Sequence, residues 1–391
     1  MASKGIRDRV AIVGMGCTPF GEHWDKGVAD LLIDAATECY RSAQVEAAAV
    51  DAYWLGTMGS GLSGLTLSEP LRIQYKPVTH VENFCATGSE ALRNACYAVA
   101  SGAYDLAMAI GVEKLKDSGY SGLVVSAPAS DGTESTITAP ATFSFLAPAY
   151  AKKYGLDDAT LKDVLARIAY KNHYNGARNP KAQFRKEVPL DAIKASPKVA
   201  GCLGIMDCSG VSDGSAAAIV CRAEDAHRYT DNPIFVKALS FIAGPAEGPK
   251  RQEYDFTSFA EVVASAEDAY KQAGVTDPRG EISMAEVHDC FTPTELVLME
   301  DLGFSPRGQG WKDVLEGRFD LKGPQPVNPD GGLKSFGHPI GASGLRMMYE
   351  MWLQLRGEAG PRQIERPKLG LTHNLGGAPG RCVSFVSIVG K

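Results

Sequence analysis

The sequence predicts an α/β protein made of two similar halves, with a further segment inserted into the first half. Two observations lead to this prediction. Strand and helix patterns alternate along most of the 391 residues, and each half contains a glycine-containing loop that bears a reactive residue and leads into a helix. The loops are CATGSEAL, starting at Cys85, and HPIGASGL, starting at His338. We therefore expect a weak internal duplication in which the two loops face each other.

The first half is predicted from β-branched runs that end in glycine and from apolar residues at helical spacing. In chain order its patterns are a strand at 9–16, a helix at 28–43, a strand at 52–59, a helix opened by Cys85 that extends to about residue 101, and a strand at 105–114. This order favours a parallel sheet covered by helices. We assign residues 1–117 to this half.

The composition changes between residues 118 and 204. Gly, Ser, Pro and Thr become frequent, and charged helical pieces such as ATLKDVLARIAYKNHY intervene. We interpret this segment as an inserted loop domain. SDGSAAAIVCRAEDA then predicts a turn and a strand that return the chain to the first sheet, so residues 205–232 complete the first half.

The second half is assigned to residues 233–391, where the order of patterns echoes the first. Its patterns are a strand at 234–244, a helix at 259–274, a strand at 283–289, helices at 293–303 and 343–357, and strands at 368–376 and 381–390.

The composition excludes several classes of protein. The formal charge is −6, and no dense block of Lys or Arg is present, which argues against nucleic-acid binding. No apolar run approaches the roughly 18 to 20 residues of a membrane span, and the charged N-terminus lacks the apolar core of a signal peptide. Nine scattered cysteines suggest reduced thiols rather than a disulfide framework. We expect a cytoplasmic protein.

Cys85 precedes a helix, where most cysteines are simply small buried residues. The free N–H groups and the dipole of a helix N-terminus favour an anion, however, and would lower the pKa of the thiol below its usual value of about 8.5. The residues that follow Cys85 are small and would let a substrate carbonyl approach the backbone. Cys85 is therefore a candidate nucleophile.

His338 lies between glycine and proline in SFGHPIGASG, a loop that can present an imidazole to a cavity. The alternative is a histidine that only caps the next helix. A cysteine and a histidine together are the minimum needed to activate a thiolate.

EVHDCFTPTE places His288, Asp289 and Cys290 at the end of a strand and before a helix, where α/β folds often carry catalytic residues. The alternative is ordinary capping, with Thr292 as an N-cap ahead of Pro293. A fourth stretch, THNLGGAPG, predicts a strand followed by a glycine turn whose N–H groups could bind an oxyanion.

Together these stretches resemble the thiolase superfamily, and specifically its sterol-carrier-protein-type (SCP-x-like) branch. The resemblance covers nearly the whole chain. Its motifs are NFCATGS, KNHYNGARNPKAQF, SDGSAAAIV, HDCF, NPDGGLKSFGHPIGASG, QLRGEAGPRQI and HNLGG. It implies the thiolase fold, with two duplicated βαβαβ-type halves in a layered α-β-α-β-α arrangement and an inserted loop domain.

The resemblance also implies roles for individual residues. Cys85 matches the nucleophile that takes up the acyl group as a thioester, and His338 matches the histidine that activates it and lines an oxyanion hole. Many thiolases carry a second reactive cysteine in a late CxG motif, but Asn374 stands there in this chain. The SCP-x-like branch lacks that cysteine and carries one in HDCF, so Cys290 is the expected acid/base.

Two oxyanion sites are implied in the same way. His288 matches a position whose asparagine, in other branches, holds a catalytic water near the thioester oxygen, so it is assigned to that site. The second site is formed by the backbone N–H groups of Cys85 and Gly376, in the loop that contains Asn374.

The expected activity is that of an acyltransferase of lipid metabolism. It would cleave a 3-oxoacyl-CoA with CoA to acyl-CoA and acetyl-CoA, or run the reverse Claisen condensation. Neither a bound cofactor nor a metal is expected, and the residues that bind the CoA nucleotide are unknown. The family further implies a homodimer or a dimer of dimers.

Two other functions stay open. One is a thiolase-like subunit for aldol cleavage, or for acyl transfer to a non-CoA acceptor, beside a small OB-fold partner. Retention of Cys85, Cys290 and His338 argues against a pure aldolase, which needs no thioester nucleophile. The other is a non-catalytic scaffold, which would be favoured if no acyl donor reacted with Cys85.

Overall fold

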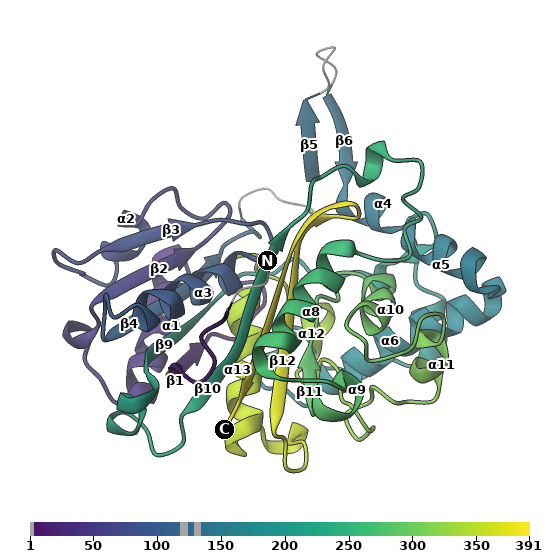
Figure 1. The fold of residues 1–391 in the computed structure, drawn as a ribbon. Coiled ribbons are helices and arrows are strands. Elements are labelled where there is room, and N and C mark those ends of the chain that lie inside the picture. The colour runs from purple at the N-terminus through teal and green to yellow at the C-terminus, as the bar shows by residue number, and fades with distance from the viewer. Residues whose placement is uncertain (1–3, 118–123, 129–133) are drawn as a thin grey trace.

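A nine-stranded sheet dominates the computed structural model, which describes residues 4–117, 124–128 and 134–391 (Figure 1). The strands of the first half are β1 (Val10–Cys17), β2 (Ala52–Gly56), β3 (Val78–Val81), β4 (Leu106–Glu113) and β9 (Gly214–Arg222). Those of the second half are β10 (Ile234–Ala243), β11 (Met284–Glu286), β12 (Leu369–Ala378) and β13 (Arg381–Gly390). The strand order is β11-β12-β13-β10-β1-β9-β4-β2-β3.

The two halves repeat one topology, which confirms the predicted duplication. In each half a parallel pair, β2–β4 or β11–β12, is followed by two antiparallel neighbours, β9 and β1 or β13 and β10. Beyond β11 a single parallel bridge between Ala285 and Val327 stands where β3 pairs with β2 in the first half. The halves meet through a short antiparallel pairing of β1 with β10.

The expectation of a parallel sheet is wrong for half of the strand pairs in the first half. β4 and β9 are antiparallel, as are β9 and β1. A strand buried on both faces has the same continuous apolar pattern whichever direction it runs, so the sequence did not report the direction.

Helices cover both faces of each half. The first half contains α1 (Val28–Ala43), α2 (Leu65–Ser68) and α3 (Thr87–Ala100). The second contains α8 (Ala260–Ala273), α9 (Pro278–Glu281), α10 (Thr292–Asp301), α11 (Gly310–Leu315), α12 (Gly332–Ser335) and α13 (Ser343–Arg356). α3 and α13 contact each other between the halves, where α3 also packs on β4 and α13 on β12. This arrangement agrees with the layered fold.

The close contact between the halves depends on glycine at a specific place. A Cβ atom at Gly111, in β4, would lie 2.0 Å from the carbonyl oxygen of Gly341. Real side chains do not approach backbone atoms so closely, so only glycine lets the loop before α13 rest on β4. As a result the loops that precede α3 and α13 lie side by side, as the duplication predicted.

The chain between β4 and β9 forms α4 (Ala139–Phe143), α5 (Leu146–Tyr154), α6 (Asp158–Gly176), α7 (Leu190–Lys194) and the short strands β7 (Lys198–Ala200) and β8 (Leu203–Gly204). A hairpin of β5 (Val124–Pro128) and β6 (Glu134–Thr138) projects from the molecule (Figure 1). Apolar residues of α4 to α6 share one core with the second half. The proposed boundaries at 118 and 204 stay a prediction.

Two smaller findings concern the whole molecule. All nine cysteines are free thiols. Within the described ranges, no helix has the length and apolarity needed to cross a membrane.

Candidate active site

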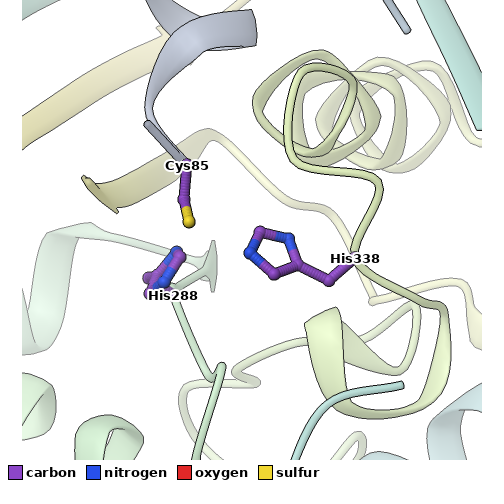
Figure 2. Close-up of side chains that lie close together, drawn as sticks. All are labelled: Cys85, His288 and His338. Carbon is purple, nitrogen blue, oxygen red and sulfur yellow. The ribbon is translucent and has the colours of Figure 1, made fainter. Parts of the chain in front are cut away.

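Cys85, His288 and His338 converge at the junction of the two halves (Figure 2). One sulfur or ring nitrogen from each lies within 4.8 Å of the others. Cys85 comes from the turn before α3, His288 follows β11, and His338 lies between α12 and α13. The ring centroids of the two histidines are 5.4 Å apart and their planes are nearly perpendicular. Three of the four predicted catalytic residues therefore form one cluster.

The turn that carries Cys85 is tight and strained. The carbonyl of Asn83 accepts a hydrogen bond from Ala86 N, and the Thr87 hydroxyl accepts one from Asn83 N at 2.8 Å. Phe84 has a φ of +51°, a left-handed conformation that is unfavourable for an aromatic residue. Such strain is characteristic of functional sites, and here it directs Cys85 towards the two histidines.

The resting thiol of Cys85 differs from its predicted state. Burial, with a further contribution from the carboxylate of Glu113, raises its pKa to about 12. The N-terminus of α3 does not lower the pKa of this thiol overall as predicted, because removing a thiolate from water costs more free energy than the helix dipole contributes. Cys85 is therefore a neutral thiol in the free protein and needs a base.

His338 is oriented to be that base. Its Nδ1 lies 2.7 Å from the Ser343 hydroxyl, which in turn lies 3.0 Å from the Pro339 carbonyl. A hydroxyl has one proton, and the carbonyl can only accept, so the hydroxyl donates to Pro339 and accepts from Nδ1–H of His338. Nε2 then carries the free lone pair, and it has no partner within the described part of the chain. Burial lowers the pKa of His338 to about 3, so the ring is neutral.

His288 is also neutral. Burial lowers its pKa well below the usual range, and His338 and His373 add to this effect. The Nδ1 of His288 is buried, as are both ring nitrogens of His373 in β12, and none of these atoms has a partner among residues 4–117, 124–128 and 134–391. His373 belongs to HNLGG, but the sequence analysis gave it no role; two adjacent histidines from distant strands can be recognised only in the fold.

Cys290 is buried just beyond this cluster, and its sulfur lies 3.7 Å from the Thr294 hydroxyl. Burial raises the pKa of its thiol well above the usual range, and Cys85 contributes to the increase. Cys290 is thus within electrostatic range of Cys85 and only two residues from His288.

Asp289 holds the His338 segment in place. Its carboxylate accepts hydrogen bonds from the backbone N–H groups of Leu333 and Lys334, at 2.6 and 3.1 Å, and from the side chain of Asn172 at 2.7 Å. Burial, and then Glu295, raise its pKa to about 7. Asp289 thus caps α12, the turn that precedes His338.

The alternative in which Thr292 is the N-cap of the helix is wrong. Thr292 is the first residue of α10, Phe291 occupies the N-cap position, and the Thr292 hydroxyl donates to Asp207 at 2.6 Å. The sequence located the start of the helix to within one residue. The Thr292 hydroxyl does not cap the helix because it is hydrogen-bonded to Asp207, 85 positions away.

Glu113 is a residue that the sequence analysis missed. It is fully buried at the end of β4, where its two oxygens accept five hydrogen bonds. The donors are the hydroxyls of Thr57 and Ser60 and the backbone N–H groups of Met58, Gly59 and Gly341. Glu113 therefore ties the first half to the loop of His338. The sequence signal that could have identified Glu113 is an acidic residue at the end of an apolar strand, in GVEK.

Family models match this chain along both halves. "Thiolase, N-terminal domain" matches residues 10–202, and "Thiolase C-terminal domain-like" matches residues 249–389. The chain belongs to the thiolase family. It is accordingly an acyltransferase enzyme of thiolase type, and the resemblance inferred from the sequence motifs is confirmed.

Curated thiolase relatives extend over nearly the full chain. An acetyl-CoA acetyltransferase of Methanothermobacter thermautotrophicus is 39% identical, with 96% of this chain and 98% of the relative covered. One of Methanocaldococcus jannaschii is 36% identical, with 98% and 99% covered. Human sterol carrier protein 2 is 33% identical over 94% of this chain and 70% of that protein.

Two solved structures share the thiolase fold. "Ltp2-ChsH2(DUF35) aldolase" superposes with a TM-score of 0.83 at 22% identity, and 98% of each chain is covered. The Acat5 thiolase of Ascaris suum in complex with coenzyme A gives a TM-score of 0.71 at 16% identity, with 98% of this chain and all of that chain covered. At these identities the likeness concerns the fold alone.

Asn374 stands where the resemblance places the late thiolase cysteine. It is fully buried, and its oxygen accepts a hydrogen bond from the Ser89 hydroxyl of α3, while its amide nitrogen has no partner among the described residues. Its place in the oxyanion loop stays a prediction. Gly376, two residues on, packs on the nucleophile turn, since a Cβ there would lie 2.3 Å from the carbonyl oxygen of Asn83. This contact brings the backbone of β12 close to Cys85. The oxyanion role of Gly376 stays a prediction.

The ligand types in the cluster are those that zinc binds. The ligand atoms around a tetrahedral zinc ion would be roughly 3.3 to 3.8 Å apart, from metal–ligand distances of about 2.0 to 2.3 Å, so Cys85, His288 and His338 could hold one after small rotations. The chemistry described above uses the thiol and imidazoles directly, and the expectation of a metal-free enzyme stays a prediction.

Proposed function

We propose that this thiolase cleaves a 3-oxoacyl-CoA with CoA to acyl-CoA and acetyl-CoA, or catalyses the reverse Claisen condensation, through an acyl thioester on Cys85. The observation that carries the proposal is the unpartnered Nε2 of His338 beside the neutral thiol of Cys85, with Nδ1 fixed by Ser343. A base with a fixed tautomer next to a weakly acidic nucleophile is the minimum for thioester formation.

In the degradative direction, Nε2 of His338 takes the proton from Cys85 as the sulfur attacks the 3-oxo carbon. The resulting oxyanion is stabilised by the backbone N–H groups of Cys85 and Gly376. Cleavage of the carbon–carbon bond leaves the acyl group on Cys85 and releases acetyl-CoA as an enolate. His288 and the protonated His338 donate to the enolate oxygen in this proposal.

Cys290 completes the proton balance. Its thiol protonates the α-carbon of the enolate, and the thiolate that remains takes the proton from incoming CoA. The CoA sulfur then attacks the acyl thioester, acyl-CoA leaves, and Cys85 recovers its proton from His338. Each side chain ends in its starting state, so the cycle needs no redox step. The raised pKa of Cys290 suits a group that must hold its proton until an enolate forms.

The test is to incubate the protein with acyl-CoA and 3-oxoacyl-CoA donors of different length and to measure intact and peptide masses. The expected result is a single acyl adduct on Cys85 that disappears when CoA is added. Absence of any adduct on Cys85 with every donor would contradict the proposal.

A second candidate activity is aldol cleavage, or acyl transfer to a non-CoA acceptor, together with a small OB-fold partner. The likeness to the structure named "Ltp2-ChsH2(DUF35) aldolase" favours it, since that title names a second protein. The presence of Cys85, Cys290 and His338 supports the thiolase reaction over this candidate. Release of a ketone or aldehyde from a β-hydroxyacyl-CoA by the Cys85→Ala variant would establish aldol cleavage, because that reaction needs no thioester.

We also propose a homodimer, alone or within a dimer of dimers, that forms through β3. This strand lies at the edge of the sheet, and several large apolar side chains close to it in sequence are exposed. They are Leu62, Leu65, Tyr75 and Phe84. An uncovered strand edge beside exposed apolar residues favours pairing with a second copy. A stable, fully active monomer in sedimentation experiments would contradict the proposed dimer.

We also place the enzyme in the cytoplasm, where it would serve lipid metabolism. Its nine cysteines are free thiols, which fits a reducing compartment.

A further inference from the structure

Three lysines are buried in the described part of the chain, and one of them differs from the others. Lys114 is paired with Asp213 and Asp117, and Lys171 is paired with Glu295. Lys334, only 3% exposed, has no carboxylate within ion-pair distance among the described residues. Its ammonium donates to Nε2 of a neutral histidine, His173 of α6, at 3.2 Å.

The nearest carboxylates are engaged elsewhere. Asp289 accepts from the backbone N–H of Lys334 itself and from two further donors. Asp207 accepts from the Thr292 hydroxyl and from Gly204 N. Both raise the proton affinity of Lys334 from a distance, but burial dominates and lowers its pKa to about 8. The ammonium is therefore mostly charged at neutral pH and uses one of its three donors.

A charge buried in this way is unfavourable unless a partner arrives. His173 cannot supply the missing negative charge, since burial and the adjacent Lys334 lower its pKa to about 3 and keep the ring neutral. Lys171, by contrast, has Glu295, the side chain of Asn172 and the Val327 carbonyl around its ammonium. The comparison identifies Lys334 as a buried cation with two free donors rather than a member of a structural ion pair.

The location of Lys334 connects it to the catalytic residues. Lys334 lies in α12, four positions before His338. Cys208 is within electrostatic range of Lys334, which would stabilise its thiolate form. Cys208 is bridged to Phe291, and Ser209 N donates to the carbonyl of Cys290 at 2.9 Å. The ammonium is thus near Cys208, in the segment that hydrogen-bonds to the backbone of Cys290, the proposed acid/base.

The approach to the ammonium is bordered by a partly exposed aromatic ring. The centroid of the Phe184 ring lies 5.9 Å from Nζ of Lys334, and Phe184 is 38% exposed. Cys208 is only half-buried. Phe184 and Cys208 are thus partly accessible neighbours of the buried ammonium.

We propose that Lys334 and His173 form a recognition site for a carboxylate at the far end of the acyl group, so that the preferred substrates are ω-carboxyacyl thioesters, a conclusion that rests on the thiolase function proposed above. The carboxylate accepts from the two free donors of Lys334, while the bond to His173 holds the ammonium in place. The lysine has already lost its water on folding, so a carboxylate gains more binding free energy from pairing with it than from pairing with a lysine at the surface. A neutral acyl chain leaves the charge unpaired and is disfavoured.

The experiment compares donors with the same number of acyl carbons: succinyl- with butyryl-CoA, glutaryl- with pentanoyl-CoA, and adipyl- with hexanoyl-CoA. The rate of acylation of Cys85 is followed by mass. The expected result is a preference of about tenfold or more for the carboxyacyl donor at one chain length at least. Equal or slower reaction of the carboxyacyl donor at all three lengths would overturn the proposal, whatever any variant does.

The Lys334→Met variant keeps the apolar stem and removes the charge. Its two donors are expected to react at similar rates, whereas Lys312→Met, which removes an exposed lysine of α11, keeps the preference. A preference that persists in Lys334→Met would assign it to another residue and overturn the site. If neutral donors acylate Cys85 but carboxyacyl donors have no advantage, only this inference fails. If no donor acylates Cys85, the thiolase proposal fails with it.

Discussion

Cys85 and Cys290 are two free thiols of one active site whose surroundings differ in one respect. Burial raises the pKa of both, so neither is a thiolate at rest. Cys85 has two imidazoles within 4.8 Å, whereas the side-chain hydrogen-bond partner of the Cys290 sulfur among the described residues is the hydroxyl of Thr294 at 3.7 Å. A thiol beside a base can become a nucleophile, and one without a base keeps its proton until a strongly basic carbanion arrives.

The largest effect is expected for Cys85→Ser, which tests the first half of this comparison. A serine hydroxyl is far less acidic than a thiol, and His338 cannot ionise it to a useful extent. Acylation should fall on the order of a million-fold, as when a nucleophile is removed from other covalent enzymes. Mass measurement after incubation with acyl-CoA checks this, with an unchanged melting temperature as the control for folding. A turning-over acyl-serine would end the assignment.

Cys290→Ala tests the other side of this comparison, the role of Cys290 as the acid/base. This variant should still accept an acyl group on Cys85, while α-proton exchange and carbon–carbon bond formation fall by about 100- to 10,000-fold, the typical contribution of acid/base catalysis. The measurement follows deuterium exchange at the α-carbon of acetyl-CoA together with acylation. Near-normal exchange would show that Cys290 is only a packed thiol, and His288 would become the leading candidate for moving the proton.

Glu113→Gln separates two effects of Glu113 on Cys85: its negative charge, and its hydrogen bonds that hold the His338 loop in position. The change removes a negative charge that raises the pKa of the thiol, so alkylation of Cys85 at neutral pH should become faster. An amide nitrogen would also face some of the five donors around Glu113, which loosens the His338 loop. We expect acylation to slow by about 10- to 100-fold despite the more acidic thiol. Faster acylation would show that charge, not position, is the role of Glu113.

The smallest effect concerns stability and checks that the imidazoles are neutral. The pKa of His338, like that of His173 and His373, is lowered from 6.5 to about 3 by burial. Between these values the unfolded chain binds more protons at these rings, so acidification destabilises the fold by about 1.4 kcal/mol per pH unit and histidine. Asp289, with its pKa raised to about 7, opposes this, because its contribution is lost as the pH rises.

Urea unfolding at pH 6.0, 5.5 and 5.0 measures this slope. His338→Gln should reduce it by about 1.4 kcal/mol per pH unit, and Cys290→Ala, which removes no group that titrates in this range, should leave it unchanged. An unchanged slope in His338→Gln would mean that His338 titrates in the folded protein as it does in the unfolded chain, and the lowering of its pKa by burial would be wrong.

Much of the fold followed from local patterns. The predicted strand at 105–114 is β4, the predicted helix at 343–357 is α13, and the repeated order of the halves is present in the sheet. Strand direction was not predictable, because a doubly buried strand carries no directional signal. Thr292 was misassigned for a related reason: its hydroxyl bonds Asp207, and no local rule describes a contact across 85 residues.

By itself, the sequence determined the elements, the duplication and the residues on which the chemistry depends, because periodicity and motifs are local properties of the chain. Only the tertiary structure decided how those residues are charged. Cys85 rests as a thiol, and His338 presents Nε2, because of burial and of partners such as Glu113 and Ser343. Lys334 lacks a counter-ion among the residues that the structure describes, because the carboxylates near it bond elsewhere. Ionisation depends on solvent access and on neighbours from distant parts of the chain, and both exist only once the halves have packed.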